Sequence, residues 1–198
     1  MIAFNKYYNK FNILSVSLVI VLSIGGYFFT TSFKSNQIQA AKVIYEDWQV
    51  ASDPDYSEQL FQKITINFSH TGYSHLALLK KGSDLAKENN LEGSLKMFYQ
   101  LKENSDGYFG NSLINGIART NIARISISLG KFEDALVVLE KYSKDEDAYT
   151  HELKGDALTG VGSNELALQQ YQSALEKYAD TGLRNLVELK INNLNINE

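Results

Sequence analysis

An uncharged stretch, residues 11–33 (FNILSVSLVIVLSIGGYFFTTSF), constrains the fold of this 198-residue chain more than any other feature. No charged residue stands between Lys10 and Lys34. As an α-helix, with a rise of about 1.5 Å per residue, the stretch would be roughly 35 Å long. The hydrocarbon core of a bilayer is about 30 Å thick. The sequence therefore predicts a transmembrane helix over 11–33, preceded by a short tail, 1–10, and followed by one water-soluble domain, 34–198.

A cleaved signal peptide is the alternative for the same stretch. The apolar part of a signal peptide is about 7–15 residues long and ends at small residues. Here the apolar run continues from Ile13 to Phe29, and bulky aromatic residues follow. We therefore expect the stretch to remain as an anchor in the lipid bilayer. The lysines beside it favour a cytoplasmic amino terminus by only about one charge.

The composition of the remaining chain favours an all-α protein and excludes several functions. Lys6 and Lys10 are the only basic residues before the stretch, so residues 34–198 hold 17 of the 19 Lys and Arg and all 23 Asp and Glu. Such an acidic part is a poor nucleic-acid binder. The absence of cysteine excludes disulfides and thiolate metal sites. The single proline, Pro54, agrees with a helical protein, since proline disrupts helix interiors.

Two helices are predicted directly after the anchor. Apolar residues recur at helical spacing over 35–50, and Trp48 among them is expected to pack in a core rather than bind a ligand. The segment around Asp53 and Pro54 ends that helix, because proline restricts the preceding residue and Asp is a good N-cap. The second helix carries these residues on one face: Leu60, Phe61, Ile64 and Phe68.

A repeated motif organises the rest of the chain. Three short turns begin at Asn89, Gly130 and Gly162, which are 41 and 32 positions apart, close to the period of about 34 residues in tetratricopeptide repeats. Each turn is preceded by a small residue and followed by a second small residue and a bulky one. These are Gly82, Ser94 and Phe98; Ala123, Ala135 and Leu139; and Gly155, Ala167 and Tyr171. Gly or Asn at the turn accepts the left-handed conformation that ends a helix.

The fold predicted from this motif is an α-solenoid of degenerate tetratricopeptide-like hairpins. The hairpins cover about 74–103, 115–143 and 148–178, and small residues let the two helices of each approach closely. A final helix, 183–194, is expected to cap the last hairpin through its leucines. These are Leu183, Leu186, Leu189 and Leu194.

No catalytic or metal-binding constellation is recognisable. His70 and His75 are five residues apart, which is not the spacing that aims two ligands from a helix at one metal, and His151 stands alone. We therefore predict that the protein is not an enzyme and uses no cofactor.

A protein-binding groove is the better-supported site, because the first helices of stacked hairpins line a concave surface. The repeat register places eight residues on it: Leu79, Ser83, Lys87, Thr120, Arg124, Tyr149, Glu152 and Asp156. The alternative is that they are ordinary solvated helix surface. Homo-oligomers formed through uncovered repeat faces are a further alternative.

Three segments give the chain a family resemblance. They are NIARI at 121–125, ELKGDAL at 152–158 and, above all, LKINNL at 189–194. With the anchor, they resemble the ancillary subunit family of the bacterial SecYEG translocon. The resemblance implies a single-span (type II) inner-membrane protein with a cytoplasmic amino terminus and a periplasmic repeat domain. Members often begin with a longer acidic segment, whereas this chain has only ten residues before the stretch and no acid among them.

The function implied by this resemblance is a non-enzymatic scaffold beside the translocon. It would contact nascent secreted proteins or periplasmic chaperones and help transfer one to the other. The alternative is a membrane-anchored repeat adaptor for another envelope assembly, such as the division or cell-wall machinery.

Overall fold

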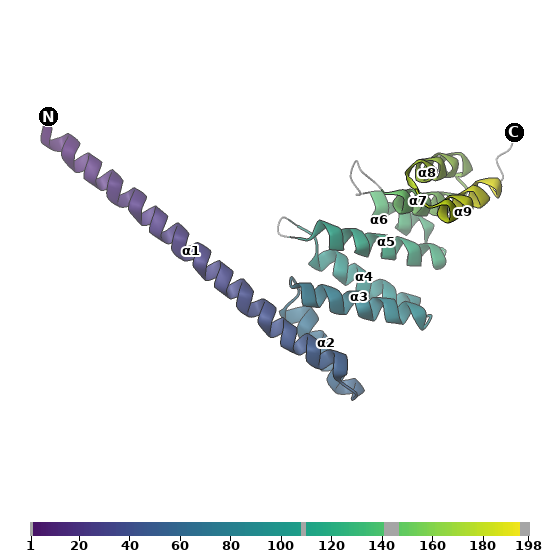
Figure 1. Cartoon of the computed structure of the whole chain (residues 1–198), viewed down its shortest axis with the longest axis horizontal. Coiled ribbons are helices and arrows are strands. Elements are labelled where there is room, and N and C mark those ends of the chain that lie inside the picture. Colours follow the sequence, from purple (N-terminus) through teal and green to yellow (C-terminus); the bar gives the residue numbers. More distant parts are fainter. Residues whose placement is uncertain (1, 108–109, 141–146, 195–198) are drawn as a thin grey trace. The chain divides into compact units, whose positions relative to one another are not determined.

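The computed structural model describes residues 2–107, 110–140 and 147–194, and for residues 2–21, 24, 25 and 28 it describes the helical backbone alone. All regular elements of these residues are α-helices, which confirms the predicted all-α class. The chain divides into two compact units, residues 1–73 and 74–198 (Figure 1).

The first unit is built from α1 (Ile2–Val50) and α2 (Pro54–Asn67). Helix α1 runs without a break through the uncharged stretch and on to residue 50. Helix α2 begins at Pro54, and the Asp53 carboxylate accepts a hydrogen bond from the Tyr56 backbone N–H at 2.7 Å, as expected for an N-cap. Trp48 is buried and lies 5.7 Å from the Phe61 ring, so its predicted core role is confirmed.

The predicted transmembrane helix lies largely outside the residues whose side chains are described. Among those that are described, no helix has a segment long and apolar enough to cross a membrane. Side chains 11–21, 24, 25 and 28 of the predicted span are not among them. The anchor therefore stays a prediction.

The second unit stacks its helices in chain order (Figure 1). They are α3 (Gly72–Lys87), α4 (Leu91–Asn104), α5 (Ser112–Ser128), α6 (Phe132–Glu140), α7 (Ala148–Gly160), α8 (Asn164–Lys177) and α9 (Thr181–Asn192). From α4 onward each helix packs against the next, and α5 also contacts α7 directly. The last residues of the predicted second hairpin, 141–143, lie outside the described residues.

The three turns of the repeat motif share one geometry. Asn89, Gly130 and Gly162 have positive φ angles of 60°, 72° and 80°. After each, the next N–H reaches back five residues to a helix carbonyl, at 2.8 Å in all three turns. This is the Schellman ending of a helix, and it satisfies carbonyls that would otherwise lack partners. The predicted turns are therefore confirmed.

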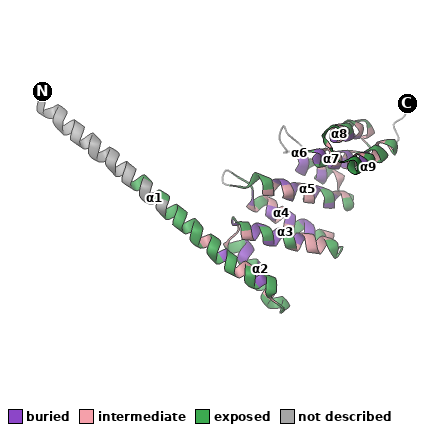
Figure 2. Cartoon of the chain, viewed as in Figure 1, coloured by how far each residue is buried: buried purple, intermediate pink, exposed green. Residues whose placement is uncertain are grey.

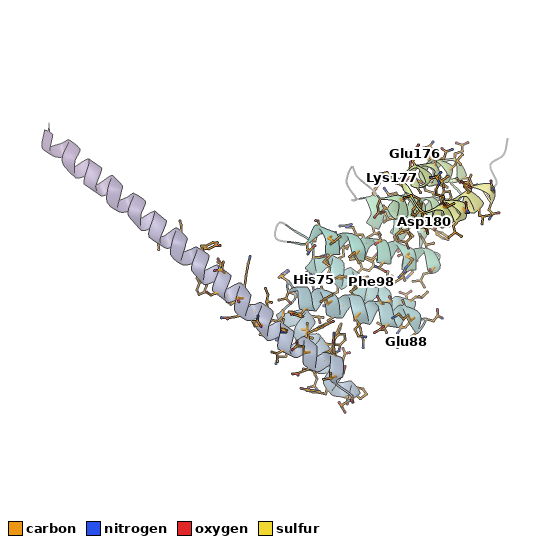
Figure 3. All side chains as sticks on the ribbon, in the orientation of Figure 1. His75, Glu88, Phe98, Glu176, Lys177 and Asp180 are labelled. Carbon is orange, nitrogen blue, oxygen red and sulfur yellow. The ribbon has the colours of Figure 1, made fainter. Side chains whose placement is uncertain are left out.

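Within the hairpins, small residues of the first helix receive a ring from the second. A Cβ built at Gly82 would stand 3.0 Å from the Phe98 ring, and one at Gly155 only 2.4 Å from the Tyr171 ring. Figure 3 labels Phe98 where α3 meets α4, and the buried residues gather between the helices (Figure 2). In the middle hairpin Ala123 and Leu139 are fully buried.

Arg119 occupies a place where the repeat consensus has an aromatic residue early in the first helix. It is 7% exposed on α5. Its guanidinium donates to Asn115 Oδ1 at 2.6 Å and to the Val138 carbonyl of α6 at 3.1 Å. The bond from Arg119 to the Val138 carbonyl therefore joins α5 to α6.

The face by which the final helix packs differs from the prediction. Val187 is fully buried on α9, and Ile191 and Leu194 pack with it against Tyr171 and its neighbours on α8. Leu183, Leu186 and Leu189 are 41%, 54% and 58% exposed, so the expectation that they cover the last hairpin is wrong. Spacing alone indicated an amphipathic helix but did not decide which of two adjacent apolar faces would be buried.

Candidate functional site

The eight residues predicted for the groove lie on the first helices of the three hairpins. Leu79, Ser83 and Lys87 are on α3, Thr120 and Arg124 on α5, and Tyr149, Glu152 and Asp156 on α7. Among the described residues, no hydrogen bond or ion pair joins the α3 group to the other two. The α5 and α7 groups lie closer together: the charges of Arg124, Glu152 and Asp156 all act on the Tyr149 hydroxyl.

On α3, the predicted cation is already paired. Lys87 and Lys80 bind the two oxygens of Asp84 at 3.1 and 2.7 Å. Their hydrogen bonds lower the pKa of the Asp84 carboxyl. These are exposed pairs along one helix, which contribute little to stability.

On α5, the two predicted residues differ in what they offer. The Thr120 hydroxyl donates to the Gly116 and Ile117 carbonyls of its own helix. Arg124 is exposed, and its guanidinium donates to Asn121 Oδ1 at 2.9 Å. Within the described residues it has no carboxylate partner, so it is a cation able to meet an acidic group of another molecule.

On α7, Glu152 and Asp156 form a clasp around one lysine of α9. Lys190 Nζ lies 2.7 Å from Glu152 Oε1 and 2.7 Å from each carboxylate oxygen of Asp156. Burial by itself would lower the pKa of Lys190, but the hydrogen bonds to the two carboxylates outweigh it and the net shift is upward. The two acids therefore hold the capping helix rather than face an open groove.

Two tyrosines complete the clasp. Tyr171 OH donates to Asp156 Oδ1 at 2.8 Å, and Tyr178 OH donates to Glu152 Oε2 at 2.6 Å. Burial raises the pKa of both hydroxyls well above the usual range, and the neighbouring carboxylates add to the rise. We call the set Glu152, Asp156, Tyr171, Tyr178 and Lys190 the Lys190 clasp.

Tyr149 stands at the edge of the clasp and is 39% exposed. Burial of part of its ring raises the pKa of its hydroxyl. An aromatic ring that is partly open, next to the exposed Arg124, offers stacking and a charged donor to a bound chain. Leu79 and Ser83 on α3 are half-buried and Lys87 is exposed. Of the five predicted residues on α5 and α7, Arg124 and Tyr149 are the exposed ones that lie outside the Lys190 clasp.

The arrangement does not resemble a catalytic or metal centre. Within the described residues, no group of three or more His, Asp or Glu side chains is placed to hold a metal ion. The acids and the lysine of the clasp are bound to one another, which leaves no carboxylate there poised to accept a proton from a substrate. His151 is half-buried and its Nδ1 lies 2.9 Å from Gln170 Oε1.

Comparisons with known proteins bear on nearly the whole chain. The sequence matches the family of the tetratricopeptide repeat-like domain over residues 3–196. The chain belongs to this family. One similar protein is the ancillary SecYEG translocon subunit of Escherichia coli (strain K12), 23% identical over 190 residues that cover 92% of this chain and 89% of that protein. No solved structure matches the chain.

Two segments that carry the resemblance meet in this tetratricopeptide repeat-like domain. Glu152 and Asp156 belong to the ELKGDAL segment and Lys190 to the LKINNL segment, and the clasp joins them across 34 to 38 positions of sequence. Sequence reasoning missed Lys190, Tyr171 and Tyr178 as partners of the predicted acids. The signal was an acid pair one helical turn apart and a lysine near the end of the terminal helix, but distance in the chain hid their pairing.

Proposed function

We propose that this chain is a membrane-anchored adaptor without catalytic activity, which associates with the SecYEG translocon and helps transfer translocated proteins to periplasmic chaperones. The observation that carries the proposal is the match along almost the full length of both chains to an ancillary SecYEG translocon subunit. A likeness that included only the repeats would indicate the fold alone. This one extends to the amino-terminal stretch as well.

In this proposal residues 11–33 anchor the chain in the inner membrane. Their lack of charge favours insertion, and α1 continues unbroken to residue 50, so the helix leaves the bilayer without a flexible joint. Residues 1–10 would be a cytoplasmic tail and 34–198 a periplasmic domain. The exposed rings of Tyr27, Phe29 and Phe33 suit the membrane–water interface.

The repeat domain would supply the recognition surface. Arg124 and Tyr149 would be among its contacts, and they suit a segment that combines an acidic and an apolar residue. The clasp has a structural task in this proposal, since it fixes α9 against α7 and α8. The match to the tetratricopeptide repeat-like domain family over residues 3–196 supports a scaffold rather than an enzyme.

Site-specific photo-crosslinking in cells tests the placement beside the translocon. A photoreactive residue at Leu22 or Phe29, both exposed on α1, is expected to give products with translocon subunits. Gln169, exposed on α8, is the matched control in the repeat domain. Absence of any translocon product from both α1 positions would overturn the proposal. Products with division or cell-wall proteins would instead favour an adaptor of another envelope assembly.

Topology is tested separately with single cysteines, because the natural chain contains none. A membrane-impermeant maleimide added to intact spheroplasts is expected to label Tyr56→Cys, which is exposed on α2, and not Lys6→Cys. The reverse pattern would place the repeat domain in the cytoplasm and exclude a role in the periplasm.

A further inference from the structure

Asp106 and Gly107, which follow the C-cap of α4, hold two reactive groups in contact. They form the only Asp–Gly pair of the sequence, and both are exposed. The Gly107 backbone N–H donates to Asp106 Oδ1 at 2.8 Å. That oxygen is bonded to Cγ, so the backbone nitrogen lies beside the carboxyl carbon of the preceding residue. Contact between two groups that can react with each other raises the rate of their reaction.

The surroundings of Gly107 leave room for the two groups to join. Its φ angle is +92°, which glycine adopts without strain. A Cβ built on it would meet no atom within 4 Å. Within the described residues, its N–H donates to no backbone carbonyl. A bond between the Gly107 nitrogen and the Asp106 side chain therefore breaks no backbone hydrogen bond of the described structure.

The reaction open to this pair is an intramolecular condensation followed by hydrolysis. The Gly107 nitrogen attacks Cγ of the Asp106 carboxyl in its acid form. A C–N bond forms and the Cγ–OH bond breaks, so the amide hydrogen and the hydroxyl leave as water and a five-membered succinimide remains. Water then opens one of the two carbonyl–nitrogen bonds. Opening at the α-carbonyl leaves the chain linked through the side-chain carboxyl, as isoaspartate, with the mass unchanged.

A second pair of similar chemistry, Asn115–Gly116, is held in a way that prevents the reaction. It is the only Asn–Gly pair of the sequence, and a neutral amide is attacked more readily than a carboxylate. However, Asn115 Nδ2 donates to the Lys102 carbonyl at 2.8 Å, and its Oδ1 accepts from Arg119 at 2.6 Å. Gly116 is buried within α5, where its N–H belongs to the hydrogen-bond ladder of the helix. Both reacting groups are therefore already bound elsewhere.

From these two geometries we propose that Asp106 is a site of spontaneous isomerisation to isoaspartate in the folded protein, and that folding protects Asn115. The product is a substrate for the class of methyltransferases that act on isoaspartyl carboxylates. Isomerisation inserts one extra carbon into the backbone after Asp106. The Asn111 N–H donates to the Ser105 carbonyl at 2.9 Å and ties the two sides of this point together. We therefore expect α4 and α5 to keep their packing.

The experiment uses purified full-length protein kept at neutral pH and physiological temperature for several weeks, once folded and once in urea. Cleavage after Lys102 and Arg119 releases one peptide, 103–119, that holds both pairs. Electron-transfer fragmentation locates isoaspartate in it, and a mass gain marks deamidation. In the folded protein isoaspartate is expected to accumulate at Asp106 severalfold over the fresh sample, with Asn115 unchanged. In urea Asn115 is expected to react faster than Asp106.

Two substitutions at the exposed position 106 sharpen the test. Asp106→Asn gives the chain two Asn–Gly pairs and is expected to deamidate at 106 several times faster than at Asn115 while folded. Asp106→Glu keeps the charge but would need a six-membered ring, so it is the matched control and is expected to lose the isoaspartate. Circular dichroism checks that both variants fold.

Two results would contradict the proposal. Absence of isoaspartate at Asp106 in the folded protein would overturn the assignment of the site. Deamidation of Asn115 at the same rate in the folded protein and in urea would overturn its protection by the contacts of α5. Methyl transfer from a labelled donor by an isoaspartyl methyltransferase measures the product independently of fragmentation, and it is expected to be lost in Asp106→Glu.

Discussion

The first and third hairpins of the repeat domain have the same helix–turn–helix arrangement. They differ in the contacts made by the ring that packs between their helices. In α3–α4, Phe98 packs on Gly82 and the Ser94 hydroxyl donates to the Gly82 carbonyl at 2.6 Å. In α7–α8, Tyr171 takes the place of the phenylalanine, and its hydroxyl continues into the Lys190 clasp. The first hairpin is therefore closed by contacts of its own, whereas the third depends on a helix beyond it.

This difference shows how one repeat motif serves two purposes. The spacing of small and bulky residues sets how closely two helices approach, and a phenylalanine or a tyrosine ring fills the space between them equally well. A hydroxyl on the ring adds a polar tip that needs a partner when buried. In the third hairpin that partner is Asp156, which also binds Lys190, so the tyrosine couples hairpin closure to the seating of α9.

The largest difference between the hairpins is expected from replacing their glycines with alanine. Gly155→Ala would set a Cβ 2.4 Å from the Tyr171 ring, and we expect a loss of about 2 kcal/mol in the free energy of unfolding. Gly82→Ala meets Phe98 at 3.0 Å, and the gain in helix propensity of up to about 1 kcal/mol offsets most of the crowding. Urea unfolding of both variants tests this. Equal losses would show that the two hairpins are packed alike.

A slightly smaller effect is expected from removing the cation of the clasp. Lys190→Met leaves Glu152 and Asp156 partly buried without a counter-charge, at a cost of about 1–2 kcal/mol once solvent screening is allowed for. Hydrogen exchange is expected to increase in α7 and α9 and stay unchanged in α3. Lys96→Met, on an exposed lysine of α4, is the control. Unchanged exchange in α9 would mean that its apolar contacts alone hold it.

Exchanging the two ring types tests the role of the hydroxyl. Tyr171→Phe removes a hydrogen bond to Asp156 while Lys190 remains, so we expect a loss of about 1 kcal/mol. Phe98→Tyr introduces a hydroxyl into a fully buried site, at a similar cost of about 1–2 kcal/mol. Differential scanning calorimetry measures both. A Phe98→Tyr variant as stable as the natural chain would show that the first hairpin also has room for a polar tip.

The smallest effect is expected from alkaline pH. The pKa of Lys190 is raised in the folded protein, so its contribution is fully present below the ordinary lysine value near pH 10.4 and is lost as pH rises through the folded pKa. The raised pKa values of Tyr171 and Tyr178 act in the same direction, because an ionised hydroxyl would be buried and would also face a carboxylate. Exchange in α9 is expected to increase above about pH 10, before that in α3. The Lys190→Met variant should show a weaker pH dependence.

The turns and the hairpin contacts could be predicted from the sequence because they are local. Asn89, Gly130 and Gly162 end their helices through conformations that few other residues adopt readily. The small residues Gly82 and Gly155 are within about 20 positions of the rings they receive. Their period therefore appears directly in the sequence.

The candidate site could be predicted only in part. The repeat register places Arg124, Tyr149, Glu152 and Asp156 on first helices, and the structure brings their charges into one neighbourhood. The repeat register could not indicate that Glu152 and Asp156 are paired with a lysine, since their partner Lys190 is more than thirty residues away. Arg119 was missed for the same reason, because the carbonyl it binds belongs to the next helix.

The sequence by itself determined an all-α chain, the positions of its turns and an uncharged stretch long enough to span a bilayer. Each of these follows from composition, spacing or the conformational limits of single residues. Tertiary structure alone decided which face of α9 is buried, which acids are neutralised and which side chains stay exposed for partners. Those outcomes depend on contacts between helices far apart in the chain, where a small difference in packing or charge selects one of several faces that the sequence pattern allows.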